Sequence, residues 1–219
     1  MMPQAQRLRK TIEVQPIGAD HLQTVAEVHC AAFPDSALST LGTEAVRRYY
    51  EWQLSGAHDS VALGAFVEGE VGGFCVGGVF RGKMSGYLRQ NRWFLISRLA
   101  RHPWLIARTS FRARLVSALR ILKLLPQPKN AVALYRDSDP TSFGILAIAV
   151  HPRSQGLGVG RVLMAEAEAI ARRRGFRAMN LSVHVTNQQA IRFYEGLEWQ
   201  RRPAPNSVWQ GEMTKCLNG

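Results

Sequence analysis

The residues best suited to chemistry are a glutamine and three glycines within six positions: Gln155, Gly156, Gly158 and Gly160. Glycine lets the backbone approach a ligand because no Cβ atom stands in the way. The first N–H groups of a helix have no partner inside that helix, so a helix beginning here would offer them to phosphate oxygens. The spacing therefore predicts a phosphate-binding turn, with an ordinary structural helix start as the alternative.

Two common phosphate-binding loops do not fit this stretch. A Walker loop needs lysine and then serine or threonine after its last glycine, but Arg161 and Val162 follow Gly160. A dinucleotide-binding turn needs the pattern Gly-x-Gly-x-x-Gly, whereas these glycines alternate with single residues. The turn must therefore be of another kind.

A strand and a helix must hold this turn in place. Residues 145–150 form a continuous apolar run, which is typical of a strand buried on both faces. From Val159 onward apolar residues recur at spacings of three and four, which predicts a helix. Three arginines precede Gly175, where the helix should end.

A second pattern lies downstream, with Asn187, Ala190, Phe193 and Tyr194 at fixed spacing. Together with the glycine turn, it resembles the GNAT superfamily of acetyl-CoA-dependent N-acetyltransferases. The resemblance is specific over residues 145–199 and looser before them.

The chain departs from the family at one point. Where the family has Leu-Gly-Phe, this chain has Leu-Glu-Trp at positions 197–199. We interpret the glycine as having moved to Gly196, which predicts a different geometry for the turn before the next strand.

The resemblance implies a cofactor site and one catalytic residue. The turn would hold the pyrophosphate of coenzyme A, the preceding strand would bond its pantetheine arm, and Tyr194 would protonate the departing thiolate. A phenol, with a pKa of about 10, stays protonated where a thiol near 8.5 ionises. The implied cofactor-binding residues are Ile148, Ala149, Val150, Gln155, Gly156, Leu157, Gly158, Val159, Gly160, Arg161 and Asn187.

The expected activity is acetyl transfer from acetyl-CoA to the primary amine of a small molecule, such as an amino sugar. No nucleophilic cysteine or serine constellation is evident, so we expect direct attack in a ternary complex. The general base stays open among His184, Glu27, His29 and Asp35. The rival hypothesis is a non-catalytic module that binds acyl-CoA.

The expected fold is a single α/β domain over residues 1–219, with a mixed, mostly antiparallel sheet flanked by helices. The first half predicts a strand, two helices and a hairpin that turns at Gly69 and Glu70, and the second half ends in strands around a short helix. The predicted strands are 11–16, 60–68, 71–80, 145–150, 178–185, 199–202 and 208–216, and the flanking helices are 20–33 (capped by Asp20), 43–54 and 187–195. By resemblance, the loops 35–42 and 203–207 border the acceptor site.

A basic insertion, predicted over residues 81–130, separates the third and fourth strands. Residues 81–129 contain twelve Lys and Arg and no Asp or Glu, so they carry the whole net charge of +12. Residues 87–101 and the stretch after Pro103 predict helices. The insertion could be a lid or homodimer contact, or could bind an anionic substrate, a membrane surface or a nucleic acid.

The remaining composition narrows the possibilities. The three cysteines are far apart in the sequence and form no cluster with histidine, so we expect neither a disulfide framework nor a metal site. The first residues lack the apolar core of a signal peptide, and no apolar run approaches the roughly 20 residues that span a bilayer. We expect a cytoplasmic protein, either free or peripheral at a membrane.

Overall fold

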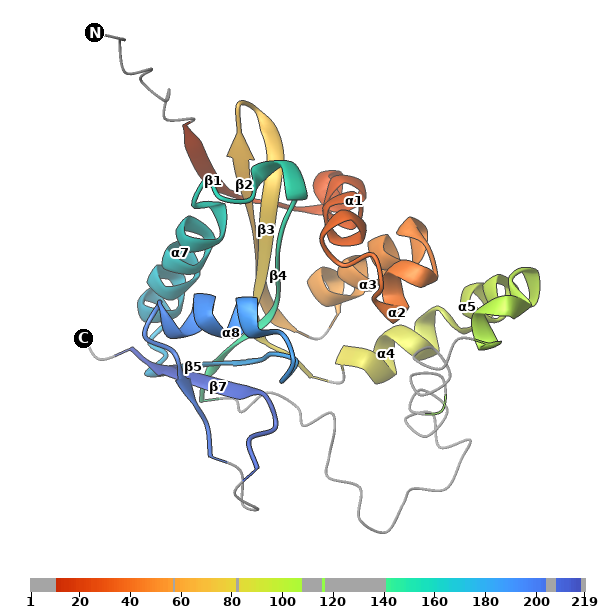
Figure 1. Ribbon diagram of the computed structural model, residues 1–219. Helices are drawn as coiled ribbons and strands as arrows, with labels where there is room; N and C mark the ends of the chain where they lie inside the picture. Colours follow the sequence, from red (N-terminus) through yellow and green to blue (C-terminus); the bar gives the residue numbers. More distant parts are fainter. Residues whose placement is uncertain are drawn as a thin grey trace, which may run out of the picture.

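The computed structural model describes residues 11–56, 58–81, 83–107, 116, 141–203 and 208–217. Their strands form one sheet in the order β1-β2-β3-β4-β5-β7-β6 (Figure 1). Only β4 and β5 pair in parallel, which confirms the predicted mixed, mostly antiparallel sheet. The strands are β1 Ile12–Pro16, β2 Asp59–Val67, β3 Glu70–Val79, β4 Phe143–Val150, β5 Ala178–Ser182, β6 Gln200–Arg201 and β7 Glu212–Cys216.

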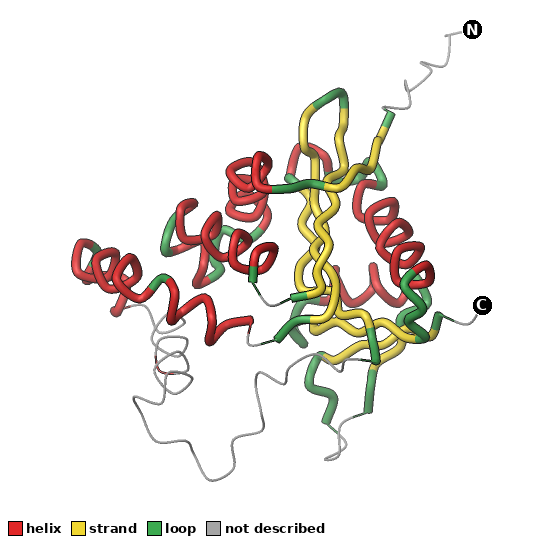
Figure 2. The backbone as a smooth tube through the Cα atoms, turned by 180° about the vertical axis from the view of Figure 1, so that it is seen from behind, coloured by secondary structure: helices red, strands yellow, loops and turns green. Residues whose placement is uncertain are grey.

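Helices cover both faces of the sheet (Figures 1 and 2). One face packs on α7 and α8, and the other packs on α1 and α3, so each face has its own hydrophobic cluster. None of the described helices is long and apolar enough to cross a bilayer. The helices are α1 Leu22–Ala32, α2 Ala37–Thr40, α3 Thr43–Ser55, α4 Lys83–Gln90, α5 Arg92–Arg101, α7 Val159–Arg173 and α8 Gln188–Glu195, with short 3-10 helices η1 Ala19–His21, η2 Pro103–Ala107 and η3 Pro152–Ser154.

The central strand β4 has unequal neighbours along its length. It pairs with β3 as far as Val150, but with β5 only over residues 143–145. Residues 146–148 are half-buried. Both faces of the strand are still covered, as predicted, because Ile148 packs against the cluster on one face and Leu146 packs against the cluster on the other. The departure of β5 instead opens one edge of the strand. We call the backbone of residues 146–150 on this side the open edge of β4.

Strand β3 is glycine-rich because its neighbours come close. A Cβ atom at Gly73 would lie 2.8 Å from both the carbonyl oxygen of Ala149 and a methyl carbon of Val159. The register of the pair β2–β3 places the tight turn at Glu68 and Gly69, both with positive φ. The turn thus lies one residue earlier than predicted, as a two-residue hairpin loop that requires φ > 0 at both positions.

Several predicted boundaries move. Strand β5 ends at Ser182 and β7 begins at Glu212, so both are shorter than predicted, and Asp20 lies in η1 rather than at the cap of α1. The helix predicted over residues 87–101 breaks at Asn91, whose buried side chain donates to the carbonyl of Tyr87. The predicted loop 203–207 and the insertion beyond residue 107 lie, except for Pro203 and residue 116, outside the described residues.

Candidate active site

The glycine turn lies between the end of β4 and the start of α7, as predicted. Gly156 and Gly158 have φ values of 78° and 89°, in the left-handed region that glycine occupies without strain. A Cβ atom at either position would find no atom within 4 Å, so the space beside the turn is open. Gly160 serves a different purpose, because its missing side chain lets the ring of Phe193 approach α7.

The turn presents a row of unused backbone donors. No described residue accepts a hydrogen bond from the N–H groups of residues 156–160, whereas the N–H groups of Arg161 and Val162 both donate to Gly158. These free donors lie at the N-terminus of a 15-residue helix, where the helix dipole adds partial positive charge. The arrangement can bind the oxygens of a phosphate or pyrophosphate.

The open edge of β4 leads directly into this turn. It contains Ile148, Ala149 and Val150, the residues whose backbone the sequence suggested as ligand contacts. The carbonyl of Val150 already accepts a bond from the side chain of Gln155, at 3.4 Å, which braces the turn against the strand. An unpaired strand edge can bond an extended ligand that carries amides, much as it would bond a further strand.

Tyr194 faces the same region from α8. It is 9% exposed and belongs to the cluster that includes Val159 and Cys75, against which Ile148 packs. Burial raises the pKa of Tyr194, and the nearby thiol of Cys75 raises it further. No described residue bonds its hydroxyl, which therefore stays protonated and free to donate.

Asn187 has a structural role that the sequence analysis missed. Its side-chain oxygen accepts a bond from the N–H of Ala190 at 3.0 Å, so it caps α8. The pattern of asparagine followed by a short amphipathic helix is the local signal for such a cap. The amide nitrogen of this exposed side chain still points to no described acceptor.

The turn after α8 differs from the sequence interpretation. Glu198 has a φ of 66°, whereas Gly196 has a right-handed conformation with φ of −68°. The left-handed position is thus residue 198, where the family has glycine, and the interpretation that the glycine had moved to 196 is wrong. The backbone N–H groups of Leu197 and Trp199 both donate to the carbonyl of Tyr194, so the turn fixes the residue beneath it.

The four candidate bases lie in different surroundings. His184 follows β5 in an exposed loop and bonds the hydroxyl of Thr186, so its predicted place on the strand is wrong. Glu27 and Asp35 are exposed. His29 is buried, its Nδ1 lies 2.9 Å from the hydroxyl of Tyr50, and burial lowers its pKa to about 4. A histidine with this pKa is neutral at pH 7.

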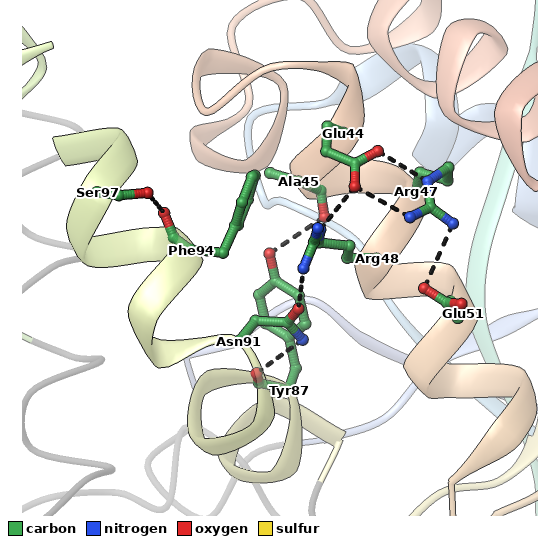
Figure 3. Close-up of polar contacts among 9 residues, drawn as sticks. All are labelled: Glu44, Ala45, Arg47, Arg48, Glu51, Tyr87, Asn91, Phe94 and Ser97. Atoms are coloured by element: carbon green, nitrogen blue, oxygen red, sulfur yellow. Dashed lines mark hydrogen bonds and ion pairs between the residues drawn. The ribbon is translucent and has the colours of Figure 1, made fainter. Parts of the chain in front are cut away.

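The loop 35–42, which the sequence placed beside the acceptor, contacts the start of the insertion. Arg98 of α5 donates from Nε to the carbonyl of Leu41 at 2.9 Å. Figure 3 shows the neighbouring contact, in which the guanidinium of Arg48 lies 4.4 Å from the ring centre of Phe94 and bonds Asn91. No local sequence pattern predicts these contacts, because they join residues far apart along the chain.

A hollow of about 240 Å³ flanks the glycine turn on the side of the β2–β3 hairpin. Its lining includes Leu157 of the turn, together with His151 and Arg153. The sequence analysis did not single out these last two residues. The side chain of His151 accepts a bond from the N–H of Arg153, which shapes η3.

Comparisons with known proteins give a family match and similar folds. The profile of the acetyltransferase (GNAT) family matches residues 22–199. Among solved structures, the PaiA N-acetyltransferase from Thermoplasma acidophilum in complex with coenzyme A has a TM-score of 0.56 and 15% identity, covering 94% of this chain and 99% of that chain. The ribosomal-protein-S18-alanine N-acetyltransferase from Escherichia coli has a TM-score of 0.55 and 13% identity, covering 95% and 96%.

A third similar structure is that of yncA from Salmonella typhimurium with its cofactor acetyl-CoA, with a TM-score of 0.53 and 16% identity, covering 94% of each chain. No curated protein matches the sequence. At these identities the structural similarity concerns the fold.

Proposed function

Because the chain belongs to the acetyltransferase (GNAT) family, whose acyl donor is acetyl-CoA, we propose that it acetylates the primary amine of a small molecule. The amine attacks the thioester directly, within a ternary complex. The observation that carries this proposal is the row of free N–H groups over residues 156–160, at the end of a strand with an open edge.

The glycine turn holds the pyrophosphate of the donor. The oxygens accept bonds from the N–H groups of residues 156–160, and the open space at Gly156 and Gly158 lets them approach the backbone. Arg161 is exposed in the first turn of α7 and adds positive charge beside the same site.

The open edge of β4 orients the pantetheine arm. Of residues 148–150, Ile148 and Val150 direct their backbone groups to the side that β5 has left, whereas those of Ala149 face β3. The arm carries amides that can pair with this edge. The amide nitrogen of Asn187 remains available to the donor, because only its oxygen is used to cap α8.

Acetyl-CoA supplies the acetyl group as a thioester. The raised pKa of Tyr194 keeps its hydroxyl protonated before the reaction. As the C–S bond breaks, this hydroxyl donates to the sulfur and protonates the departing thiolate, and solvent returns a proton to the phenolate. The attacking nitrogen loses a proton, directly or through water, to a base among His184, Glu27, His29 and Asp35.

The experiment that tests this proposal measures donor binding by calorimetry and thiol release with a panel of primary amines. We expect Gly158→Asp to weaken acetyl-CoA binding by at least about tenfold, because it adds bulk and negative charge to the cradle. The matched control is Gly175→Asp at the other end of α7, which has a similar φ of 78° and equally open space.

Unchanged affinity in a folded Gly158→Asp variant would remove the turn from the donor site. Tight binding of acetyl-CoA without thiol release for any amine would support the rival hypothesis of a non-catalytic binding module.

A further inference from the structure

Three large apolar side chains face solvent on α5 and η2. Trp93 is 71% exposed, Ile96 is 55% exposed and Trp104 is 60% exposed. Trp93 and Ile96 are three residues apart and therefore lie on the same face of α5, and Trp104 follows in η2. We call these three residues the outer face. Contiguous exposed apolar surface is typical of a site that a partner covers.

The opposite face of α5 fixes this orientation. Phe94 points toward α3 and lies against the guanidinium of Arg48, as Figure 3 shows. Arg98, one turn later on the same face, bonds the carbonyl of Leu41. The helix therefore docks on the domain through one face and holds Trp93 and Ile96 outward.

The surroundings of the outer face are basic. The guanidinium of Arg92 lies 5.3 Å from the ring centre of Trp93, and Arg89 of α4 and Arg101 of α5 are also exposed. No acidic residue occurs between positions 81 and 129 of the sequence, so no carboxylate of this segment competes for these arginines. A partner that covers the outer face must combine apolar surface with negative charge.

We propose that the outer face docks on an anionic lipid surface. Tryptophan and isoleucine can enter the boundary between headgroups and acyl chains, while the neighbouring arginines remain at the depth of the lipid phosphates. The bases of RNA could stack on the tryptophans, but they offer no apolar layer for Ile96. A second copy of this chain would bring the same arginines face to face across a two-fold contact, which like charges oppose.

Docking would place the acceptor side of the domain near the headgroups. Arg98 links the docked helix to Leu41, in the loop 35–42 that the sequence placed beside the acceptor. Only this consequence rests on the proposed function, since the docking itself requires neither acetyl-CoA nor an amine.

Flotation of the full chain with lipid vesicles tests the proposal. We expect it to float with vesicles of phosphatidylcholine and phosphatidylglycerol, but not with phosphatidylcholine alone, and to be released as salt rises. Trp93→Ala combined with Trp104→Ala should reduce the bound fraction at least about fivefold, because the apolar part of the contact is lost. Val208→Ala is the matched control, an equally exposed apolar residue on another part of the chain.

The electrostatic part is tested separately. Arg92→Glu should weaken binding to the anionic vesicles at least about threefold, whereas Arg177→Glu, an exposed arginine at the start of β5 with the same change in net charge, should not. Calorimetry with acetyl-CoA on each variant checks that the fold and the donor site persist, so a failure of docking is distinguishable from a failure of the proposed function.

Three results would overturn the proposal. The first is no flotation with anionic vesicles at low salt. The second is equal loss of binding in Arg92→Glu and Arg177→Glu, which would indicate a general attraction of the positive chain. The third is that the tryptophan variant floats like wild type, whether or not it changes RNA binding or self-association.

Discussion

At the scale of single residues, a short turn connects the backbone of Tyr194, the proposed acid, with Glu198, which has a left-handed conformation. The turn at residues 196–199 returns two N–H groups to the carbonyl of Tyr194, so the backbone of the proposed acid is held twice. One residue of that turn, Glu198, adopts a conformation that suits glycine better.

We expect Tyr194→Phe to lower kcat by about a hundredfold while leaving the affinity for acetyl-CoA unchanged, because the hydroxyl acts only as the thiolate departs. Steady-state kinetics with a true acceptor and calorimetry with the donor measure the two quantities. Tyr87→Phe is the control, since its hydroxyl bonds the carbonyl of Ala45, away from the glycine turn. A Tyr194→Phe enzyme with the kcat of wild type, where chemistry limits the rate, would contradict the assigned role.

Glu198→Gly should raise the free energy of unfolding by about 0.5–1 kcal/mol. A left-handed conformation costs a residue with a Cβ atom about 1 kcal/mol or more, and glycine offsets part of that gain through its greater freedom in the unfolded chain. Urea denaturation measures the change. Glu195→Gly is the control and should destabilise, because Glu195 lies in α8 and pairs with Arg201. A Glu198→Gly protein less stable than wild type would show that the carboxylate has an unrecognised role.

At the scale of elements, the docking of α4 and α5 on α3 connects the insertion to the predicted acceptor loop. The bond from Arg98 to Leu41 passes beside Gly42, where a Cβ atom would lie 2.7 Å from the guanidinium. The helix thus packs against the backbone of the α2–α3 connection itself, and the hydroxyl of Tyr87 anchors α4 to the carbonyl of Ala45.

We expect Arg98→Ala to raise the KM for the acceptor several-fold and to lower the free energy of unfolding by about 1 kcal/mol, because a partly buried hydrogen bond from a charged group is lost. The affinity for acetyl-CoA should not change. Arg101→Ala, an exposed neighbour on α5, should leave the acceptor KM close to that of wild type. Equal acceptor KM values for the two variants would dissociate Arg98 from the acceptor side.

The strand, turn and helix around the glycines could be predicted because their signals are local. Glycine spacing and the periodicity after Val159 fall within a few residues of one another. The contact of Arg98 with Leu41 joins residues 57 apart, and that of Arg48 with Asn91 joins residues 43 apart, so no window of sequence contains either pair. The point at which β5 stops pairing with β4 is likewise not predictable from the sequence, because it depends on how the two strands twist apart.

Local propensity also misled the prediction where tertiary contacts decided the conformation. Glycine at 196 suggested a left-handed turn there, yet the fold places it at Glu198. The sequence identifies His29 and Tyr194 as candidate functional residues. It does not show that both are buried, or which side chains surround each of them. Their roles follow from packing that the sequence does not encode locally.

At the scale of the whole molecule, His29 couples stability to pH. It joins α1 to α3 through the hydroxyl of Tyr50 and lies beside the cluster on that face of the sheet. Burial lowers its pKa from 6.5 to about 4, so it is neutral in the folded protein over a range in which the unfolded chain binds a proton.

We therefore expect the contribution of His29 to the free energy of unfolding to be fully present above about pH 6.5 and to be lost as the pH falls toward 4. The loss from this group amounts to about 3 kcal/mol. Urea denaturation at several pH values measures this slope. His29→Gln, which keeps a hydrogen-bonding group, should flatten it, whereas His184→Gln should not. The bonds from Arg47 and Arg48 lower the pKa of Glu44 to about 2. Glu44 therefore changes the free energy of unfolding only below about pH 4.5. An unaltered slope in His29→Gln would mean that another group causes the acid sensitivity.

The unequal pairing of β4 has a consequence for the rigidity of the sheet. Within the described part of the chain, backbone pairing between the half-sheet β1–β4 and the half-sheet β5–β7–β6 is confined to residues 143–145 and 179–181, while the side chains of one hydrophobic cluster span both halves. We predict that this narrow backbone seam acts as a hinge and that the amide protons along it exchange with deuterium early. A bound, extended donor would pair with the open edge of β4 and would restrict motion between the two half-sheets. Each catalytic cycle would then stiffen the enzyme on donor entry and loosen it again when the spent thiol leaves.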